Sequence, residues 1–199
     1  MKKISHIKLG LYISKMENLK PYSFWICLGS IAPDFDIPSL IRKHNYENTY
    51  EKRRRAFVKL QRDGVFGPLS CFSLGIGLHY LADYFTYPHN NNFSGSTTDH
   101  WQYEQKLVSY FADTINSLSS SNITMDILPG ELFKYVETLH EEYLTKEPSF
   151  SNDTFYILQV AVATAVVYRK LFSLNTNIQY DIEPFYGKLI RYVREVKHE

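Results

Sequence analysis

The chain has 199 residues and a net charge of +1 at pH 7, which fits one domain with a sizeable core. This balance excludes a strong overall field that would attract nucleic acid or an anionic membrane surface. Its two cysteines, Cys27 and Cys71, lie in apolar stretches. A single disulfide stays open, but buried free thiols in a reducing compartment fit better, so we expect a cytoplasmic protein.

Apolar periodicity in the first third of the chain predicts three helices, at residues 5–16, 21–28 and 48–61. The basic start has no uninterrupted apolar stretch and no small-residue cleavage site, so we interpret it as a helix rather than a signal peptide. Gly29, Ser30 and Pro33 are predicted to break the second helix. The basic run at residues 52–55 lies on the third helix, where it is expected to form a solvated face.

Four further helices are predicted at residues 69–85, 99–118, 129–144 and 153–172, and another at 184–196. Asp99 is the expected cap of the second of these, and the segment from Ser151 to Asp153 caps the fourth. Residues 90–98 and 119–122 are predicted loops. The most apolar window, residues 155–168, is too short to span a bilayer and indicates a buried core helix, with no transmembrane segment. Because no strand-like alternation occurs, the prediction is an all-α single domain over residues 1–199.

Residues that carry chemistry are concentrated between residues 79 and 104. His79 stands four residues before Asp83, and His100 four residues before Glu104, so each pair shares one helix face and can close on one cation. A lone pair of this kind is more often hydrogen-bonded or solvated than a metal site. Two pairs with His89 between them favour a metal, because helix packing demands no such concentration of imidazoles and carboxylates.

The other histidines have plainer interpretations when each is taken alone. His140 stands among glutamates and His198 near the end of the chain, and both are predicted to be surface residues. Taken alone, His6 and His44 are more readily explained as core or surface histidines than as metal ligands. Their order with the acidic residues changes that interpretation: His6, Asp34, His44, His79, Asp83, His89, His100 and Glu104.

This order resembles the zinc-dependent phospholipase C family, whose all-helical fold is shared with S1/P1-type nucleases. The resemblance rests on His6, on G-S-I-A-P-D ending at Asp34, on His44, on H-Y-L-A-D with the following P-H, and on H-W-Q-Y-E. It covers roughly the first half of the chain. It implies a multi-helix bundle of the phospholipase C / P1 nuclease type.

The resemblance implies two or three zinc ions held by those eight residues. Asp34, His44, His79 and Asp83 would surround one ion. Asp83 would bridge to a second ion that also uses His6, and His89, His100 and Glu104 would hold a third. Nitrogen and oxygen ligands suit zinc but leave manganese and iron open.

The implied activity is that of a zinc-dependent phosphodiesterase, in which a zinc-bound hydroxide attacks phosphorus and Asp34 orients or deprotonates the water. A phospholipid head group is the favoured substrate, with Trp25 and Trp101 as walls of the site, although both are more readily explained as core residues. Two alternatives remain: a single-strand nuclease, disfavoured by the charge, and a metal-stabilised protein without catalysis. No stable nucleic-acid partner is expected, and the oligomeric state is open.

One departure from the secreted enzymes of the family concerns the amino terminus. In those enzymes a processed amino-terminal Trp gives its amine and carbonyl to the metal shared with the early histidine. Here Met1 precedes His6 almost directly, and no Trp stands where cleavage would expose it. The resemblance therefore implies a second metal that is weakly held, completed by water, or absent.

Overall fold

The computed structural model describes residues 1–35, 45–118 and 125–172. Within these ranges the chain contains only helices and connecting segments, which confirms the all-α prediction. The α-helices are α1 (Lys3–Met16), α2 (Ser23–Ile31), α4 (Tyr46–Asp63), α5 (Pro68–Tyr84), α6 (Thr97–Ser117), α7 (Leu132–Leu144) and α8 (Phe150–Phe172). Short 3₁₀ turns are η1 (Lys20–Tyr22), η2 (Ala32–Phe35), η3 (Tyr87–His89) and η4 (Pro129–Glu131).

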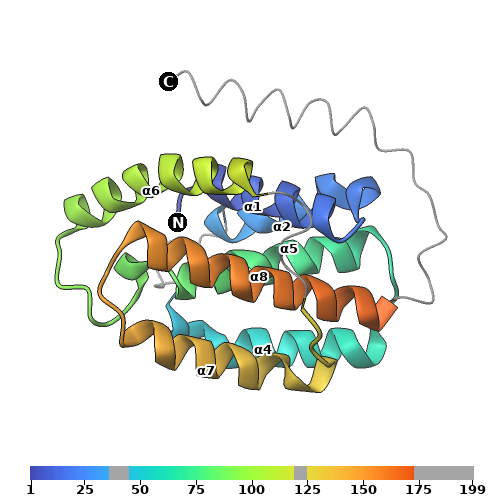
Figure 1. The fold of residues 1–199 in the computed structure, drawn as a ribbon. Helices are drawn as coiled ribbons and strands as arrows, with labels where there is room; N and C mark the ends of the chain where they lie inside the picture. The colour runs from blue at the N-terminus through green and yellow to red at the C-terminus, as the bar shows by residue number, and fades with distance from the viewer. Residues whose placement is uncertain (36–44, 119–124, 173–199) are drawn as a thin grey trace.

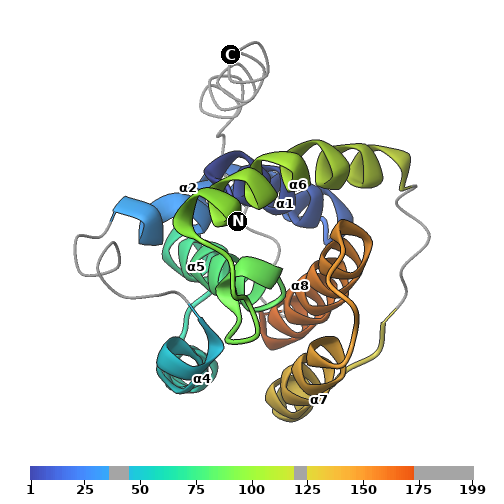
Figure 2. The same cartoon turned by 90° about the vertical axis from the view of Figure 1, so that its left-hand side faces the viewer.

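The helices form three layers. α5 and α8 lie in the middle, α1, α2 and α6 lie on one side of them, and α4 and α7 lie on the other (Figures 1 and 2). The central position of α5 lets one of its faces meet α2 and another meet α4. The position of a residue in the helical turn of α5 therefore decides whether it faces α2 or α4.

The core helix is α8, as its composition predicts. Most of its residues from Tyr156 to Tyr168 are buried among the other helices. The helix has 23 residues and is long and apolar enough by length and composition to cross a membrane, yet 72% of its apolar window is buried inside the fold. The prediction of a buried core helix over residues 155–168 is confirmed, and the helix extends beyond these residues at both ends.

The predicted break at Gly29 and Ser30 is also wrong, since both residues lie inside α2. The glycine has a packing role instead. A Cβ on Gly29 would overlap the carbonyl of Phe72 on α5, and a Cβ on Gly75 would overlap the carbonyl of Ile26 on α2. The two helices cross glycine to glycine, and this closeness sets the distance between the elements that carry Asp34 and His79.

Two predicted helix caps take different positions in the structure. Ser96, rather than Asp99, is the N-cap of α6: its Oγ accepts from the Asp99 N–H at 3.2 Å, while Asp99 Oδ2 accepts from the Ser96 N–H at 2.8 Å. Asp153 lies within the first turn of α8 and is fully buried. Cys27 and Cys71 are buried free thiols, as predicted. The predicted loop at 119–122 and helix at 184–196 lie outside the described residues.

Candidate metal centre

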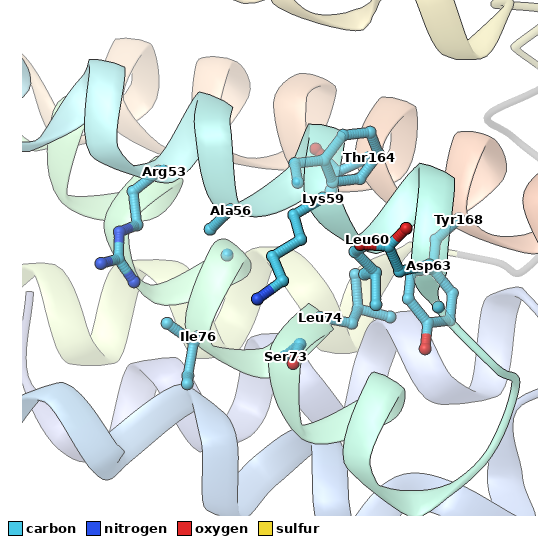
Figure 3. Close-up of a pocket in the computed structure, with 13 residues that line it drawn as sticks. Arg53, Ala56, Lys59, Leu60, Asp63, Ser73, Leu74, Ile76, Thr164 and Tyr168 are labelled. Atoms are coloured by element: carbon cyan, nitrogen blue, oxygen red, sulfur yellow. The ribbon is translucent and has the colours of Figure 1, made fainter.

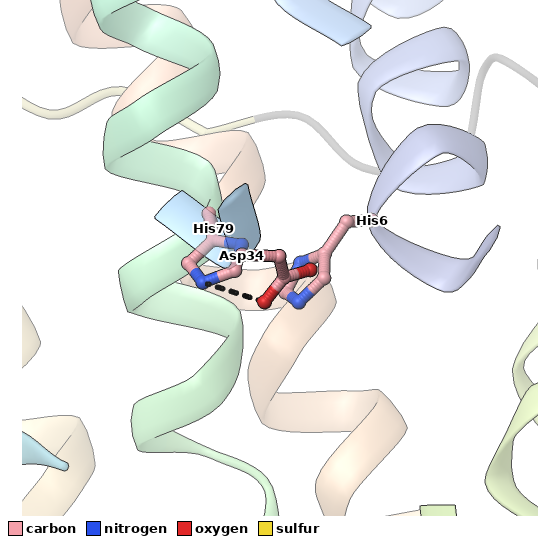
Figure 4. Close-up of side chains that lie close together, drawn as sticks. All are labelled: His6, Asp34 and His79. Carbon is pink, nitrogen blue, oxygen red and sulfur yellow. Dashed lines mark ion pairs between the residues drawn. The ribbon is translucent and has the colours of Figure 1, made fainter. Parts of the chain in front are cut away.

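Three side chains from three elements form the first group. His6 comes from α1, Asp34 from η2 and His79 from α5, and one nitrogen or oxygen atom of each lies within 4.8 Å of the others (Figure 4). His79 Nε2 lies 3.9 Å from Asp34 Oδ1. The His6 and His79 rings stack with their centroids 4.1 Å apart. The group therefore spans two helices and the turn that follows α2.

The hydrogen bonds of this group leave atoms that suit a cation. His79 Nδ1 lies 2.9 Å from the Ser30 carbonyl oxygen, so this nitrogen carries the proton and donates it, and Nε2 faces the carboxylates. Both ring nitrogens of His6 and Oδ2 of Asp34 are buried and have no hydrogen-bond partner among the residues described. Buried polar atoms of this kind ordinarily have partners. The donor set therefore fits a metal ion with nitrogen and oxygen ligands.

The second group contains His89, His100 and Glu104, whose ligand atoms also lie within 4.8 Å of one another. Glu104 Oε1 lies 3.0 Å from His89 Nε2 and 3.1 Å from His100 Nε2. His89 comes from η3, and the other two residues come from the first turns of α6. The His100 side chain is 33% exposed, so this group borders on solvent.

Asp83 lies between the two groups and faces both. Its Oδ1 is 3.3 Å from His6 Nε2, its Oδ2 is 3.3 Å from His79 Nε2, and the same Oδ2 is 3.7 Å from His89 Nδ1. The residue is 1% exposed. Oδ1 thus faces the first group and Oδ2 faces both groups, so this carboxylate connects the two candidate sites.

The amine of Met1 occupies the space beside Asp83. It lies 2.7 Å from Asp83 Oδ1, 2.8 Å from Glu104 Oε1 and 3.0 Å from His89 Nε2. Burial lowers the pKa of this amine, but the two carboxylates outweigh that effect and raise it to about 10. A positive charge thus sits where the carboxylates converge, a position for the Met1 amine that the sequence did not indicate.

The charges of the centre match those that a metal requires. Burial lowers the pKa of His79 well below its usual range and also lowers that of His89. Burial alone would raise the pKa of Asp83, but His89 and the Met1 amine hold it well below its usual range. The Met1 amine and the two imidazoles likewise hold down the pKa of Glu104 against burial. Neutral imidazoles and ionised carboxylates are the forms that bind metal.

Asp153, part of a predicted helix cap, is a buried carboxylate that supports the second group. Asp153 Oδ2 accepts hydrogen bonds from the Tyr87 N–H and the Tyr103 hydroxyl, each at 3.0 Å, and Oδ1 accepts from the Tyr143 hydroxyl at 2.7 Å. Tyr87 begins the turn that ends at His89, and Tyr103 precedes Glu104. Asp153 thereby ties α8 to both elements of the second group.

His140 is not the surface residue that its glutamate neighbours suggest. It is 4% exposed, its ring stacks on Tyr46 with centroids 4.0 Å apart, and its Nε2 lies 3.0 Å from Asn90 Oδ1. Asn90 Nδ2 in turn donates to the carbonyls of Tyr84 and Thr86. The missed signal was periodicity, because His140 continues the buried stripe of α7 through Val136, whereas the neighbouring glutamates lie on other faces.

The structure brings seven of the eight predicted ligands together, and the eighth, His44, lies outside the described residues, as does His198. The grouping differs from the one that the resemblance implied, since His6 lies with Asp34 and His79. The assignment of each residue to a particular ion stays a prediction. Of the two tryptophans, Trp25 packs against the core as expected, whereas Trp101 is 56% exposed.

Comparison with known families identifies the family of the chain. A family model described as zinc-dependent phospholipase C matches residues 4–150. The chain therefore belongs to the zinc-dependent phospholipase C family. None of the curated proteins and none of the solved structures that were compared matches it. Asp153 lies just beyond the matched residues.

Proposed function

We propose that the protein is a zinc-dependent phosphoric ester hydrolase that cleaves the head group of a phospholipid. The observation that carries the proposal is the pair of histidine–carboxylate groups that face each other across Asp83. Family membership supports a phospholipase C-like hydrolase with a zinc cofactor. The number of ions, two or three, and the reaction at phosphorus belong to the proposal.

Bound zinc lowers the pKa of a coordinated water and neutralises charge on phosphoryl oxygens. The chain's own residues fix the positions at which this happens. The Ser30 carbonyl orients His79 through Nδ1 and leaves Nε2 for a metal, while Glu104 Oε1 and Nε2 of His89 and His100 converge on one position. Asp34 has a buried Oδ2 without a hydrogen-bond partner in the described part of the chain, which suits it to hold a water and accept its proton.

The surroundings of the centre favour a phospholipid. Phe35, next to Asp34, is 64% exposed, and Trp101 follows His100 in the sequence. Lys3 Nζ lies 4.2 Å from the Phe35 ring centroid, and Lys2 Nζ lies 4.8 Å from that of Trp101. Exposed aromatic rings beside ammonium groups suit the boundary between phosphate head groups and apolar chains.

A single-strand nuclease remains the second candidate, because the same two exposed rings can stack on bases. The positive charge that a nucleic-acid backbone requires is poorly supplied, because the net charge of the chain is only +1 and Lys2 and Lys3 lie over the rings of Trp101 and Phe35. A metal-stabilised protein without catalysis is the third candidate. The partial exposure of His100 and Asp34 opposes it, since a purely structural site is closed.

The first experiment is elemental analysis of protein purified without a histidine tag, with His79→Ala, Glu104→Ala and the surface control Glu141→Gln. We expect two or three zinc ions per chain, fewer in each of the first two variants and no change in the control. Full zinc content with no hydrolysis of dihexanoylphosphatidylcholine, p-nitrophenyl phosphorylcholine or single-stranded DNA would contradict the proposed function. Faster cleavage of the DNA would select the nuclease.

A further inference from the structure

A separate cavity lies on the opposite side of α5 from the metal centre. Residues of α4, α5 and α8 enclose a groove of about 340 Å³ (Figure 3). Phe57, Leu60, Leu74 and Ile76 are among the apolar residues that line it. This volume lies within the range of sites that hold small molecules. Gly77 lines the groove and His79 belongs to the metal centre, and residues two apart on a helix point to opposite sides.

Gly77 keeps the groove open. A Cβ added to it would meet no atom within 4 Å, whereas one added to Gly75 would overlap α2. Packing therefore explains Gly75 and leaves Gly77 unexplained. A glycine inside a helix costs roughly 0.5–1 kcal/mol relative to alanine. Gly77 leaves open space beside the helix in spite of this cost to helix stability. A bound ligand could occupy that space.

The groove also carries positive charge along an apolar wall. Arg53 and Lys59 project from α4 over it (Figure 3). Arg53 Nε is buried without a hydrogen-bond partner among the residues described. Lys59 acts on Asp63 through its charge, since the hydrogen bond from Arg62 and, to a smaller extent, Lys59 lower the pKa of that carboxyl. The Arg53 guanidinium lies 4.6 Å from the Tyr80 ring centroid. Asp63, the acidic residue of the lining, is already paired with Arg62. The groove is therefore cationic and apolar at once.

We propose that this groove binds a single-chain amphiphile with an anionic head, its apolar chain lying along Gly77 and Leu74 and its phosphate or carboxylate meeting Arg53 and Lys59. Charge complementarity selects the head group, because a cation or a neutral sugar would offer neither side chain an anionic partner. The site is distinct from the metal centre and does not depend on the proposed hydrolysis.

The test uses calorimetry to measure how tightly the protein binds three ten-carbon probes: decyl phosphate, decanoate and decyl maltoside. Each probe is kept below its critical micelle concentration. The zinc-loaded, full-length protein is used. We expect the two anionic probes to bind and to raise the unfolding temperature, and the maltoside to bind at least tenfold more weakly. Stronger binding of decanoate than of decyl phosphate would indicate that the natural ligand has a carboxylate head group. The reverse order would indicate a phosphate head group.

Two variants locate the binding. Gly77→Leu fills the groove with a side chain that meets no clash at Cβ, so it should fold, keep its zinc content and lose binding of all three probes. Arg53→Gln combined with Lys59→Gln should weaken decyl phosphate roughly tenfold and leave decyl maltoside unchanged.

The proposal is overturned if Gly77→Leu binds decyl phosphate as the native protein does, or if the anionic and neutral probes bind equally. It is likewise overturned if light scattering shows a dimer that Gly77→Leu dissociates, since a second copy would then fill the groove.

Discussion

Replacing Gly75 by alanine should push α2 away from α5. The added Cβ would overlap the Ile26 carbonyl and lie 2.8 Å from Ser30 N and 2.9 Å from Gly29 Cα. Non-bonded heavy atoms are comfortable at about 3.5–4.0 Å, so the helices must separate by roughly 1 Å at this crossing. Overpacking of this kind costs about 1–3 kcal/mol, and the upper end applies because the obstacles are backbone atoms. Alanine regains about 1 kcal/mol of helix propensity, which leaves a net loss of about 2 kcal/mol.

Gly77→Ala is the matched control on the same helix. Its Cβ meets no atom within 4 Å, so only the propensity gain of up to about 1 kcal/mol remains. Urea unfolding of metal-free protein, followed by circular dichroism, should therefore separate the two variants by about 3 kcal/mol. Because η2 follows α2 directly, Gly75→Ala should also lower zinc content by moving Asp34 away from His79. Equal stability of the two variants would refute the close crossing.

Three further predictions concern buried polar groups and the metal. Burial lowers the pKa of His140 to about 4, so below pH 6.5 the unfolded chain binds a proton that the folded chain does not. Native protein should therefore lose about 2 kcal/mol of unfolding free energy between pH 7 and pH 5 through this residue, and His140→Gln should lack that part of the loss. Asp153→Ala should lower both stability and zinc content, because it leaves the Tyr87 N–H without an acceptor, whereas Asp153→Asn keeps an acceptor oxygen and should restore both; equal zinc content in all three proteins would remove Asp153 from the support of the centre. Chelation of zinc should lower the unfolding temperature, and added zinc should restore it in the native protein but not fully in His6→Ala; calorimetry with and without chelator measures this.

The sequence predicted the helices better than the roles of their residues. Periodic apolar positions identified α5, α6 and α8 because they report which helix face meets the core. Gly29 was misinterpreted because a glycine that permits close helix contact has the same letter as one that ends a helix. The sequence shows that a glycine is present, but only the position of the neighbouring helix shows whether that glycine ends a helix or permits close contact between helices.

The candidate site shows the same limit. The spacing of His79 and Asp83 predicted their proximity because both lie on one helix. The contacts between His6, Asp34 and His79 depend on how three elements pack; the family resemblance implied that Asp34 lies with His79, but it assigned His6 to another ion. Asp153 was predicted only as part of a helix cap, because its partners are two tyrosine hydroxyls and one backbone amide from distant segments. Such partners leave no periodic pattern in the sequence.

The two ligand groups differ in when the growing chain can complete them. The second group comes from one short stretch, from His89 to Glu104, while the first joins His6 to His79 across much of the chain. Local contacts form early and distant ones late, because closing a long loop costs more entropy. The contact of His6 on α1 with His79 therefore forms only after α5 has been made and has packed against α2. Metal binding that uses His6 is consequently a late step in folding. A metal ion at the first group therefore reports that the tertiary structure around it has formed.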